Sequence, residues 1–315
     1  MVDFLSIILI VAGLCLFEII SSIDNSIINA QVLSTMQKRA RRWFLVWGMI
    51  FAVFVVRGLL PWIIVWASIP SLGPIGALTA TFSNNPQVLH AVEMSSPILL
   101  MGGGIFLILL FLHWIFLEEK KFGSRDEILL TERVIGFFSV SLIIIALICW
   151  FTLKINPRIT LGAIIGAAVF FITNGLKQKA GRHKKDLIKR NISDLNKVLY
   201  LEILDATFSV DGVLGAFAFT LSVPLILIGN GIGAFVVRQF TVRKIDTIKK
   251  YIYLRRGAMY SILILGIIMI ANGFGSKAPI WLSPLATFII VGYFFWKSKR
   301  HIKRTKLLKK TKSKR

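Results

Sequence analysis

Cysteine is nearly absent from this sequence, and its scarcity excludes several kinds of site. The chain has 2 cysteines among 315 residues, Cys15 and Cys149, and each lies alone within an apolar run. They form no CxxC pair, so we expect no disulfide framework or thiolate metal site and interpret both as small core residues. No catalytic triad, zinc-hydrolase signature or nucleotide-binding loop is evident. We therefore expect no enzyme, no catalytic residues and no permanently bound cofactor.

Charged residues, and acidic ones above all, are also few. The chain has 15 Asp and Glu against 38 Lys and Arg, and charged residues make up 17% of it. It is 56% hydrophobic, and its mean hydropathy is +0.74. Soluble domains hold more charge and less apolar surface than this. The composition predicts an all-α polytopic membrane protein in a lipid bilayer, with no separate soluble domain.

Apolar runs long enough to cross a bilayer recur along the chain. They predict about nine transmembrane helices, near residues 4–30, 43–66, 97–117, 134–153, 157–174, 198–220, 223–240, 257–274 and 280–297. No basic region precedes the first run, so we expect a retained helix and not a signal peptide. Residues 68–96 hold several Pro and Gly and no Lys or Arg, which predicts an extramembrane loop or a re-entrant segment.

The basic residues predict the orientation of these helices. Of the 38 Lys and Arg, 33 fall in five segments: 37–42, 118–133, 177–197, 241–256 and 297–315. Nine spans with an outside N-terminus put all five on one side, and basic loops stay in the cytoplasm. We therefore expect a transmembrane domain over 1–297 and a basic cytoplasmic tail over 298–315. The net charge of +23 then reflects topology, and no nucleic-acid partner is expected.

Two of the predicted spans carry acidic residues. Residues 198–220 include Glu202, Asp205 and Asp211, and the first span includes Glu18 and Asp24. A carboxylate at the centre of a bilayer costs at least about 2.5–3.5 kcal/mol, so such groups need a cation, a partner or water. We therefore interpret these acids as an ion site.

The two acidic spans resemble each other. Glu18 and Asp24 are separated by five residues, as are Asp205 and Asp211, and a serine (Ser22, Ser209) lies two residues before the second acid. The tetrapeptide Phe-Val-Val-Arg ends at Arg57 and again at Arg238, each one span after its acidic motif. The halves lie five spans apart, so the second runs in the opposite direction, as in many secondary transporters. We expect repeat one over about 1–153, a connector helix at 157–174 and repeat two over about 198–297.

The acids of each pair do not share one face of a straight helix. At about 100° per residue, Glu18, Ser21, Ser22, Asn25 and Asn29 form one stripe, and Glu202, Asp205 and Ser209 form another. Asp24 and Asp211 lie about 120° away from the first acid of their pair. Either the helices break near Asn25 and Gly212, which is our expectation, or each acid serves a different neighbour.

The residues of these stripes offer only oxygen ligands. We expect the metal site to draw on Glu18, Asp24, Asn25, Asn29, Glu202, Asp205, Ser209 and Asp211. Such a set suits Mg²⁺, Mn²⁺ or Ca²⁺ better than Zn²⁺ or Cu⁺. Arg57 and Arg238 are the expected counter-charges, either in purely structural ion pairs or releasing an acid when the ion binds. A proton relay without metal is a further alternative.

These motifs resemble those of the TerC integral membrane family, named for tellurium resistance. The resemblance rests on Phe17-Glu18 with Asp24-Asn25 and on Leu201-Glu202 with Asp205 and Phe208-Ser209-Val210-Asp211, and it covers about residues 1–297. It is nearest to a bacterial branch largely of unknown function. The resemblance implies seven to nine spans, a bacterial cytoplasmic (inner) membrane, and links to manganese export and tellurite resistance. It places the ion on Asp24, Asn25, Asp205 and Asp211, with Glu18 and Glu202 next, while Gly212 replaces a serine found in many members.

The expected function is a transporter that exports a hard divalent cation, most plausibly Mn²⁺, by alternating access. Asp24 and Asp211 from the opposed halves would share the ion, and protons are possible coupling ions. The alternative is a membrane partner that delivers metal to other envelope proteins or helps to assemble them, with the basic segments as docking surfaces. An intramembrane enzyme is the third and least favoured alternative. The sequence does not indicate the oligomeric state.

Overall fold

The computed structural model describes residues 4–48, 50–79, 86–118, 127–189, 192–248 and 251–312. Within these ranges every regular element is a helix, which confirms the all-α expectation. The elements are α1 (Phe4–Ser21), α2 (Ile23–Leu33), α3 (Lys38–Trp43), η1 (Phe44–Gly48), η2 (Phe51–Leu59), α4 (Leu60–Ser68), η3 (Pro70–Leu72), α5 (Gly73–Thr79), α6 (Pro86–Leu117), α7 (Glu127–Ile155), α8 (Pro157–Lys189), α9 (Asp194–Ala216), α10 (Val223–Ile248), α11 (Leu254–Gly273) and α12 (Leu282–Lys312).

Five of the described helices are long and apolar enough to cross a membrane: Phe4–Ser21, His90–Leu117, Glu132–Ile155, Pro157–Lys179 and Leu254–Gly273. A sixth candidate is the pair Arg57–Ser68 and Pro70–Thr79, bent by 104°, the geometry of a broken span or a re-entrant loop. The predicted spans 198–220, 223–240 and 280–297 overlap α9, α10 and α12. They are not among these five helices: α9 carries acidic residues, the apolar part of α10 is short, and half of α12 is basic.

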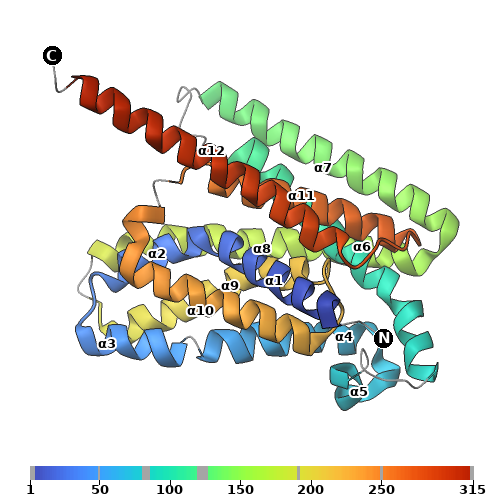
Figure 1. The fold of residues 1–315 in the computed structure, drawn as a ribbon. Coiled ribbons are helices and arrows are strands. Elements are labelled where there is room, and N and C mark those ends of the chain that lie inside the picture. Colours follow the sequence, from blue (N-terminus) through green and yellow to red (C-terminus); the bar gives the residue numbers. More distant parts are fainter. Residues whose placement is uncertain are drawn as a thin grey trace.

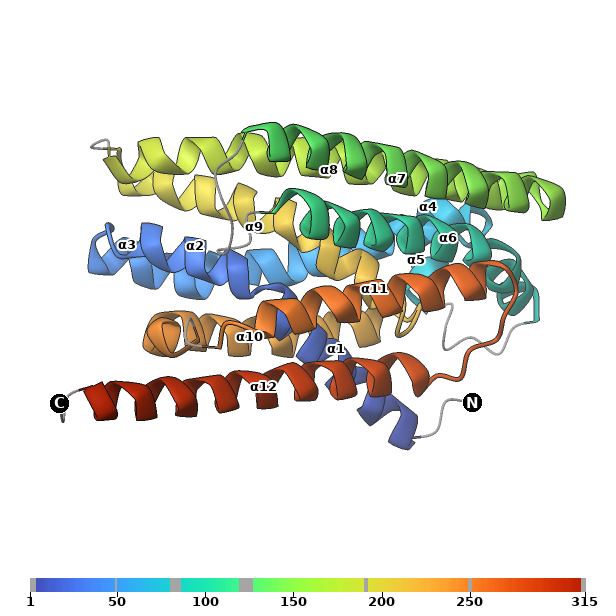
Figure 2. The same cartoon turned by 90° about the horizontal axis from the view of Figure 1, so that it is seen from above.

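The long helices lie side by side in one bundle (Figure 1). Figure 2 shows that the N-terminal end of α1 and the C-terminal end of α12 lie at opposite ends of it. The helix α3, the C-terminal ends of α8, α10 and α12, and the N-terminal ends of α9 and α11 all lie toward the end where the chain finishes. These helices contain or flank four of the five basic segments, which therefore share one end of the bundle.

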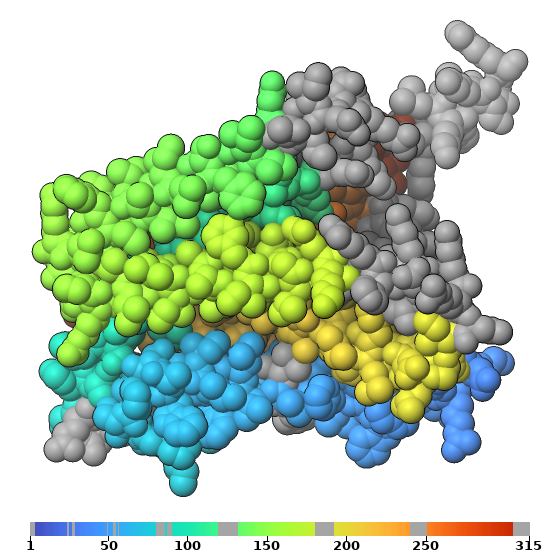
Figure 3. Space-filling model, turned by 180° about the vertical axis from the view of Figure 1, so that it is seen from behind, coloured from blue at the N-terminus to red at the C-terminus, as the bar shows by residue number. Residues whose placement is uncertain are grey.

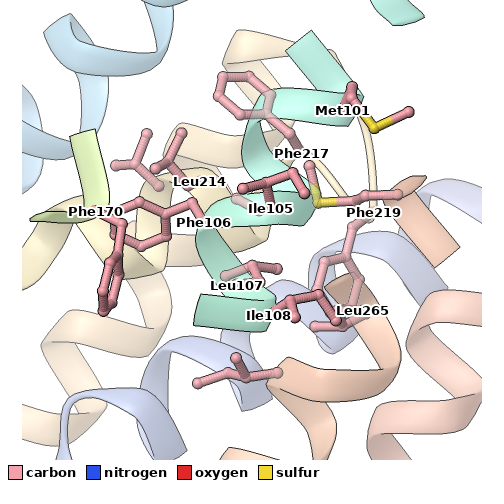
Figure 4. Close-up of a cluster of buried hydrophobic side chains, with 14 of the residues drawn as sticks. Met101, Ile105, Phe106, Leu107, Ile108, Phe170, Leu214, Phe217, Phe219 and Leu265 are labelled. Atoms are coloured by element: carbon pink, nitrogen blue, oxygen red, sulfur yellow. The ribbon is translucent and has the colours of Figure 1, made fainter. Parts of the chain in front are cut away.

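The hydrophobic core is centred on α6, which packs between α8 and α11. Figure 4 shows its side chains Ile105, Phe106 and Leu107 among residues of α8, α9 and α11. Glycines let the backbones approach closely: a methyl group on Gly102 would lie 2.8 Å from the carbonyl oxygen of Gly162, and one on Gly104 would lie 3.0 Å from that of Gly266. The run Gly102–Gly104 therefore makes close helix contacts.

One side of the bundle presents apolar side chains outward. Figure 3 shows α7 and α8 over the upper part of this face, with α9 and blue N-terminal segments below them. In the apolar part of α7 only 11% of the residues in its most hydrophobic window are buried, and Ile135, Leu142 and Trp150 are each about 60% exposed. An apolar helix with so little burial needs a surrounding as apolar as itself, because large exposed apolar patches are rare on soluble proteins. The exposed apolar side chains of this face support the conclusion that the bundle is embedded in a membrane.

Candidate ion-binding site between α1, η2, α9 and α10

Glycines on two neighbouring helices bring the Glu18 side chain of α1 into the middle of the bundle. A methyl group on Gly233 of α10 would lie 2.6 Å from Cβ of Glu18, and one on Gly212 of α9 would lie 3.0 Å from its Oε2. At Gly233 only a residue without a side chain permits this approach, whereas a side chain at Gly212 would require the Glu18 carboxylate to shift slightly. Glu18 is 1% exposed as a result, although it lies in one of the most apolar helices of the chain.

The Glu18 carboxylate pairs with an arginine from the next predicted span. Arg57, on the π-helical segment η2, places Nη2 at 2.8 Å and Nε at 3.0 Å from Glu18 Oε1. Ser22 Oγ donates to the same oxygen at 2.7 Å. Arg57 is 4% exposed, so both charges are removed from solvent together. Such a pair is stable only when both charges stay, because one left alone would be uncompensated.

Arg57 also connects this pair to Asp205 of α9. Its Nη1 lies 3.5 Å from Asp205 Oδ2, and Arg238 of α10 places Nη2 at 3.7 Å from the same oxygen. The second carboxylate oxygen, Oδ1, accepts a short hydrogen bond from the Asn25 side-chain amide. Asp205 is 6% exposed. Two carboxylates, two guanidinium groups and one amide therefore form a continuous network, which we name the arginine–carboxylate network.

Arg238 is held by the chain segment before η2. Its Nη1 donates to the carbonyl oxygen of Phe44 at 2.9 Å, and its guanidinium lies 4.5 Å from the centre of the Phe44 ring. The carbonyl and the ring fix Arg238 without adding a negative charge. The two arginines thus differ: Arg57 is bound mainly by carboxylates, and Arg238 largely by neutral groups.

The contacts of the network are reciprocal between the two sequence motifs. In the ungapped alignment Glu18 corresponds to Asp205, and Asn25 corresponds to Gly212. Glu18 lies against Gly212, and Asp205 accepts a hydrogen bond from Asn25. Gly212 and Asn25 are equivalent positions, each seven residues after the acid of its own motif. Each acid therefore contacts the same position of the other motif. Two copies related by a two-fold axis make contacts of this kind. Figure 2 shows that α1, which carries Glu18, and α9, which carries Asp205, run in opposite directions.

A small cavity borders the network. Its volume is about 20 Å³, room for one or two water-sized species, and its lining includes Glu18, Ser22, Asn25, Ser26, Asn29, Arg57, Asp205 and Arg238. The Oδ1 atoms of Asn25 and Asn29 are buried and have no hydrogen-bond partner among the described residues. Buried oxygen atoms normally have one. These two amides therefore offer unused acceptors beside two carboxylates.

The remaining predicted ligands of α9 lie outside this cavity lining. The Glu202 oxygens are buried without a hydrogen-bond partner among the described residues, and Oε1 lies close against Gly48. Ser209 Oγ donates to the carbonyl oxygen of Asp205 at 2.6 Å, within its own helix. Asp211 pairs with Lys177 of α8 through a short hydrogen bond. The side chain of Asp24 lies outside the described residues, so its meeting with Asp211 stays a prediction.

The expected helix break at Gly212 is wrong. The helix α9 runs without interruption from Asp194 to Ala216, because Gly212 serves the close approach of Glu18 and not a turn. In the first motif α1 ends at Ser21 and α2 begins at Ile23, so the helix is interrupted at Ser22, three residues before Asn25. The distortion is slight, because Ser26 N still donates to the Ser22 carbonyl at 2.9 Å. The two acids of α9 therefore serve different neighbours, the alternative that helix geometry left open.

Within the described residues, no three His, Cys, Asp or Glu side chains are grouped so that they could hold a metal ion. The network offers two carboxylates, and its other oxygen donors are amides and hydroxyls. Both carboxylates are neutralised by arginine, so a cation would have to displace a guanidinium group to reach them. In this arrangement ion pairs occupy the two carboxylates, whereas the Oδ1 atoms of Asn25 and Asn29 have no hydrogen-bond partner among the described residues.

Sequence reasoning missed Lys177, Phe44 and Ser26. Lys177 was counted with the basic segment 177–197, yet it follows the predicted span 157–174 by less than one helical turn, which was the available signal. Phe44 contributes a carbonyl oxygen and a ring face, neither of which leaves a sequence pattern. Ser26 lines the cavity but donates to the Ser22 carbonyl, as many apolar-helix serines do.

Comparison with known protein families gives one match that covers most of the chain. A family model described as "Protein of unknown function (DUF475)" matches residues 23–305, which include α2, η2, α9 and α10 in full. No curated protein matches the chain, and no solved structure does. The match leaves out Glu18 but includes Arg57, Asp205 and Arg238. The chain belongs to this DUF475 family of proteins of unknown function.

Proposed function

We propose that this protein carries a hard divalent cation, most plausibly Mn²⁺, out of the cell by alternating access between two inverted repeats. The observation that supports this most is the arginine–carboxylate network, where reciprocal contacts join two oppositely directed motif helices beside a cavity with unused oxygen acceptors. Sites of secondary transporters lie at such interfaces. The proposed cation ligands are Glu18, Asn25, Asn29 and Asp205, and Glu202 is a further candidate ligand.

In this proposal the arginines hold the empty carrier closed. Two guanidinium groups balance Glu18 and Asp205, so no net charge remains at the network while the cation is absent. An arriving divalent cation competes for the same carboxylate oxygens and repels Arg57, which must move away for the site to fill. The change from the conformation open to one side of the membrane to the one open to the other side would follow this replacement of Arg57 by the cation. Protons that bind to the same carboxylates would serve as coupling ions.

The proposed topology has nine crossings, with the N-terminus outside and the C-terminus in the cytoplasm of a bacterium. The gathering of the helix ends that flank basic segments at one end of the bundle supports one cytoplasmic side. The resemblance of both motifs to the TerC family supports Mn²⁺ as the cargo, with a link to metal or tellurite resistance. Residues 298–315 would then extend into the cytoplasm.

Flux through purified protein in liposomes tests the proposal. We expect Mn²⁺ entry into liposomes that hold a quenchable dye, and the Asp205→Asn variant should lower its rate about tenfold to hundredfold, because one charged ligand contributes about 1.5–3 kcal/mol. The matched control Glu132→Gln also removes one carboxylate, but an exposed one on α7. Equal flux in Asp205→Asn and in wild type would contradict the proposal. Mn²⁺ binding without flux would favour the alternative role as a metal-delivering membrane partner.

A further inference from the structure

A second hollow lies away from the network, where the start of α11 meets α12. Its volume is about 270 Å³, and it is lined by Tyr253, Tyr293, Trp296, Lys297, Arg300, His301 and Arg304. Three of the lining residues are permanent cations, and none is acidic. The hollow is therefore suited to an anionic group, and neither the proposed transport site nor the predicted ligands include it.

The position of this hollow along α12 corresponds to the edge of a bilayer. The helix runs for 31 residues, about 46 Å at about 1.5 Å per residue, which exceeds a hydrocarbon core of about 30 Å. Its residues 282–296 are almost wholly apolar, and the basic residues begin at Lys297. The hollow spans this change of composition. Tyr and Trp are enriched at this depth because one end of each ring system is apolar and the other polar.

The surface beside the hollow suits an acyl chain. Ile289 is 62% exposed, Tyr293 53% and Trp296 54%, all on α12. Figure 2 shows α12 at the edge of the bundle. An apolar strip that leads into a basic, aromatic-lined hollow is complementary to an anionic phospholipid. The strip suits the acyl chain, and the hollow suits the phosphate.

The cations of the hollow are already arranged by ring contacts. Lys297 Nζ lies 5.1 Å from the centre of the Tyr253 ring, and the Arg300 guanidinium lies 5.5 Å from the Trp296 ring. The backbone N–H of Tyr253 donates to Ser298 Oγ at 3.2 Å, which ties the beginning of α11 to α12. Side chains that are already ordered lose less conformational entropy when a ligand binds.

We propose that this hollow binds the phosphate headgroup of an anionic phospholipid from the cytoplasmic leaflet. Lys297, Arg300 and Arg304 contact the phosphate, Tyr293 and Trp296 contact the glycerol and upper acyl region, and Ile289 contacts the chain. Basic pockets between transmembrane helices on this side of the membrane are suited to such headgroups. Binding there fixes α12 to α11 and anchors the end of the bundle that holds the basic segments.

Native mass spectrometry of the full chain in detergent, titrated with phosphatidylglycerol, tests this site. Each basic residue near an anionic surface contributes about fivefold in affinity, so Arg300→Gln/Arg304→Gln should weaken the binding of the tightest lipid roughly 30-fold. The matched control Arg39→Gln/Arg42→Gln removes two exposed arginines from α3 at the same end of the bundle and should bind the lipid like wild type. Phosphatidylcholine and inorganic phosphate serve as competitors, and neither should displace it.

Three results would overturn the assignment. Equal lipid affinity in the two double variants would show that only overall charge matters. Displacement by inorganic phosphate at similar concentration would indicate a site for a soluble anion. Equal affinity for phosphatidylcholine would remove the role of the headgroup charge. Each outcome is independent of Mn²⁺ transport, so failure here is distinguishable from failure of the proposed function.

Discussion

The helix α9 carries two ion-pair clusters that differ in almost every respect. On one face, Asp205 joins the arginine–carboxylate network, which unites residues of α1, α2, η2 and α10. On another face, Asp211 forms a single pair with Lys177 of α8, in which the side chains are 16% and 13% exposed. The first borders a cavity with two unused amide acceptors, and the second does not line that cavity, although Asp211 Oδ1 is also buried without a hydrogen-bond partner among the described residues. One helix thus separates a multi-residue site from a simple contact.

The difference lies in which cation meets each acid. Arginine presents several donors in a planar fork and can connect two carboxylates, as Arg57 does with Glu18 and Asp205. Lysine is a compact charge on a flexible stem, and Lys177 also lies 5.2 Å from the Phe208 ring. In the proposed transport cycle the Asp205 face would change its partners, whereas the Asp211 face would tie α8 to α9 throughout.

The largest expected effect comes from removing Arg57, the cation that joins Glu18 to Asp205. Arg57→Met leaves Glu18 and Asp205 buried beside each other, so the free energy of unfolding should fall by about 3–5 kcal/mol. Unfolding in a mild micelle, followed by tryptophan fluorescence during titration with denaturant, measures the change. Arg158→Met, an exposed arginine at the α7–α8 turn, is the matched control and should alter stability little. Equal stability of the two variants would show that the network contributes nothing to the fold.

The second-largest expected effect distinguishes the two acids of α9 by how much each contributes to Mn²⁺ flux. Asp205→Asn should lower Mn²⁺ flux by about tenfold or more, and Asp211→Asn by only a few-fold, because Asp211 does not line the cavity. Flux in liposomes at equal protein density measures both. Should Asp211→Asn prove as damaging as Asp205→Asn, the ion would pass both faces of α9, and the predicted sharing of the ion by Asp24 and Asp211 would be favoured.

A smaller effect tests the close approach that forms the network. In Gly212→Ala the added methyl group would lie 3.0 Å from Glu18 Oε2, so Glu18 must shift and stability should fall by about 1–3 kcal/mol. The control is Gly175→Ala on α8, where a methyl group meets nothing within 4 Å and should stabilise the helix by up to about 1 kcal/mol. Thermal unfolding of both variants gives the comparison, and a neutral Gly212→Ala would remove the steric argument.

Sequence patterns identified the chemistry of the site better than its geometry. Burial of a charge in an apolar run is costly, so Glu18, Asp205, Arg57 and Arg238 stood out from their surroundings, and the structure brings all four into one network. The continuity of α9 at Gly212 was not predictable, because glycine serves both bends and close approaches. Which acid pairs with which cation depends on the angles at which the helices pack. These angles leave no periodic pattern in a single sequence.

The Lys177–Asp211 pair should give the smallest effect, and its size tests whether it is only a tether. Its side chains are 13% and 16% exposed, more than those of Arg57 and Glu18, so Lys177→Met should cost less than Arg57→Met, about 1–2 kcal/mol. The charge exchange Lys177→Asp/Asp211→Lys keeps both charges and should recover most of that loss. A double-mutant cycle on unfolding free energies measures the coupling. Recovery of stability together with flux would identify a tether, because a tether needs opposite charges and not a particular carboxylate. Recovery of stability without flux would instead show that the Asp211 carboxylate acts on the ion, and the two faces of α9 would then share one function.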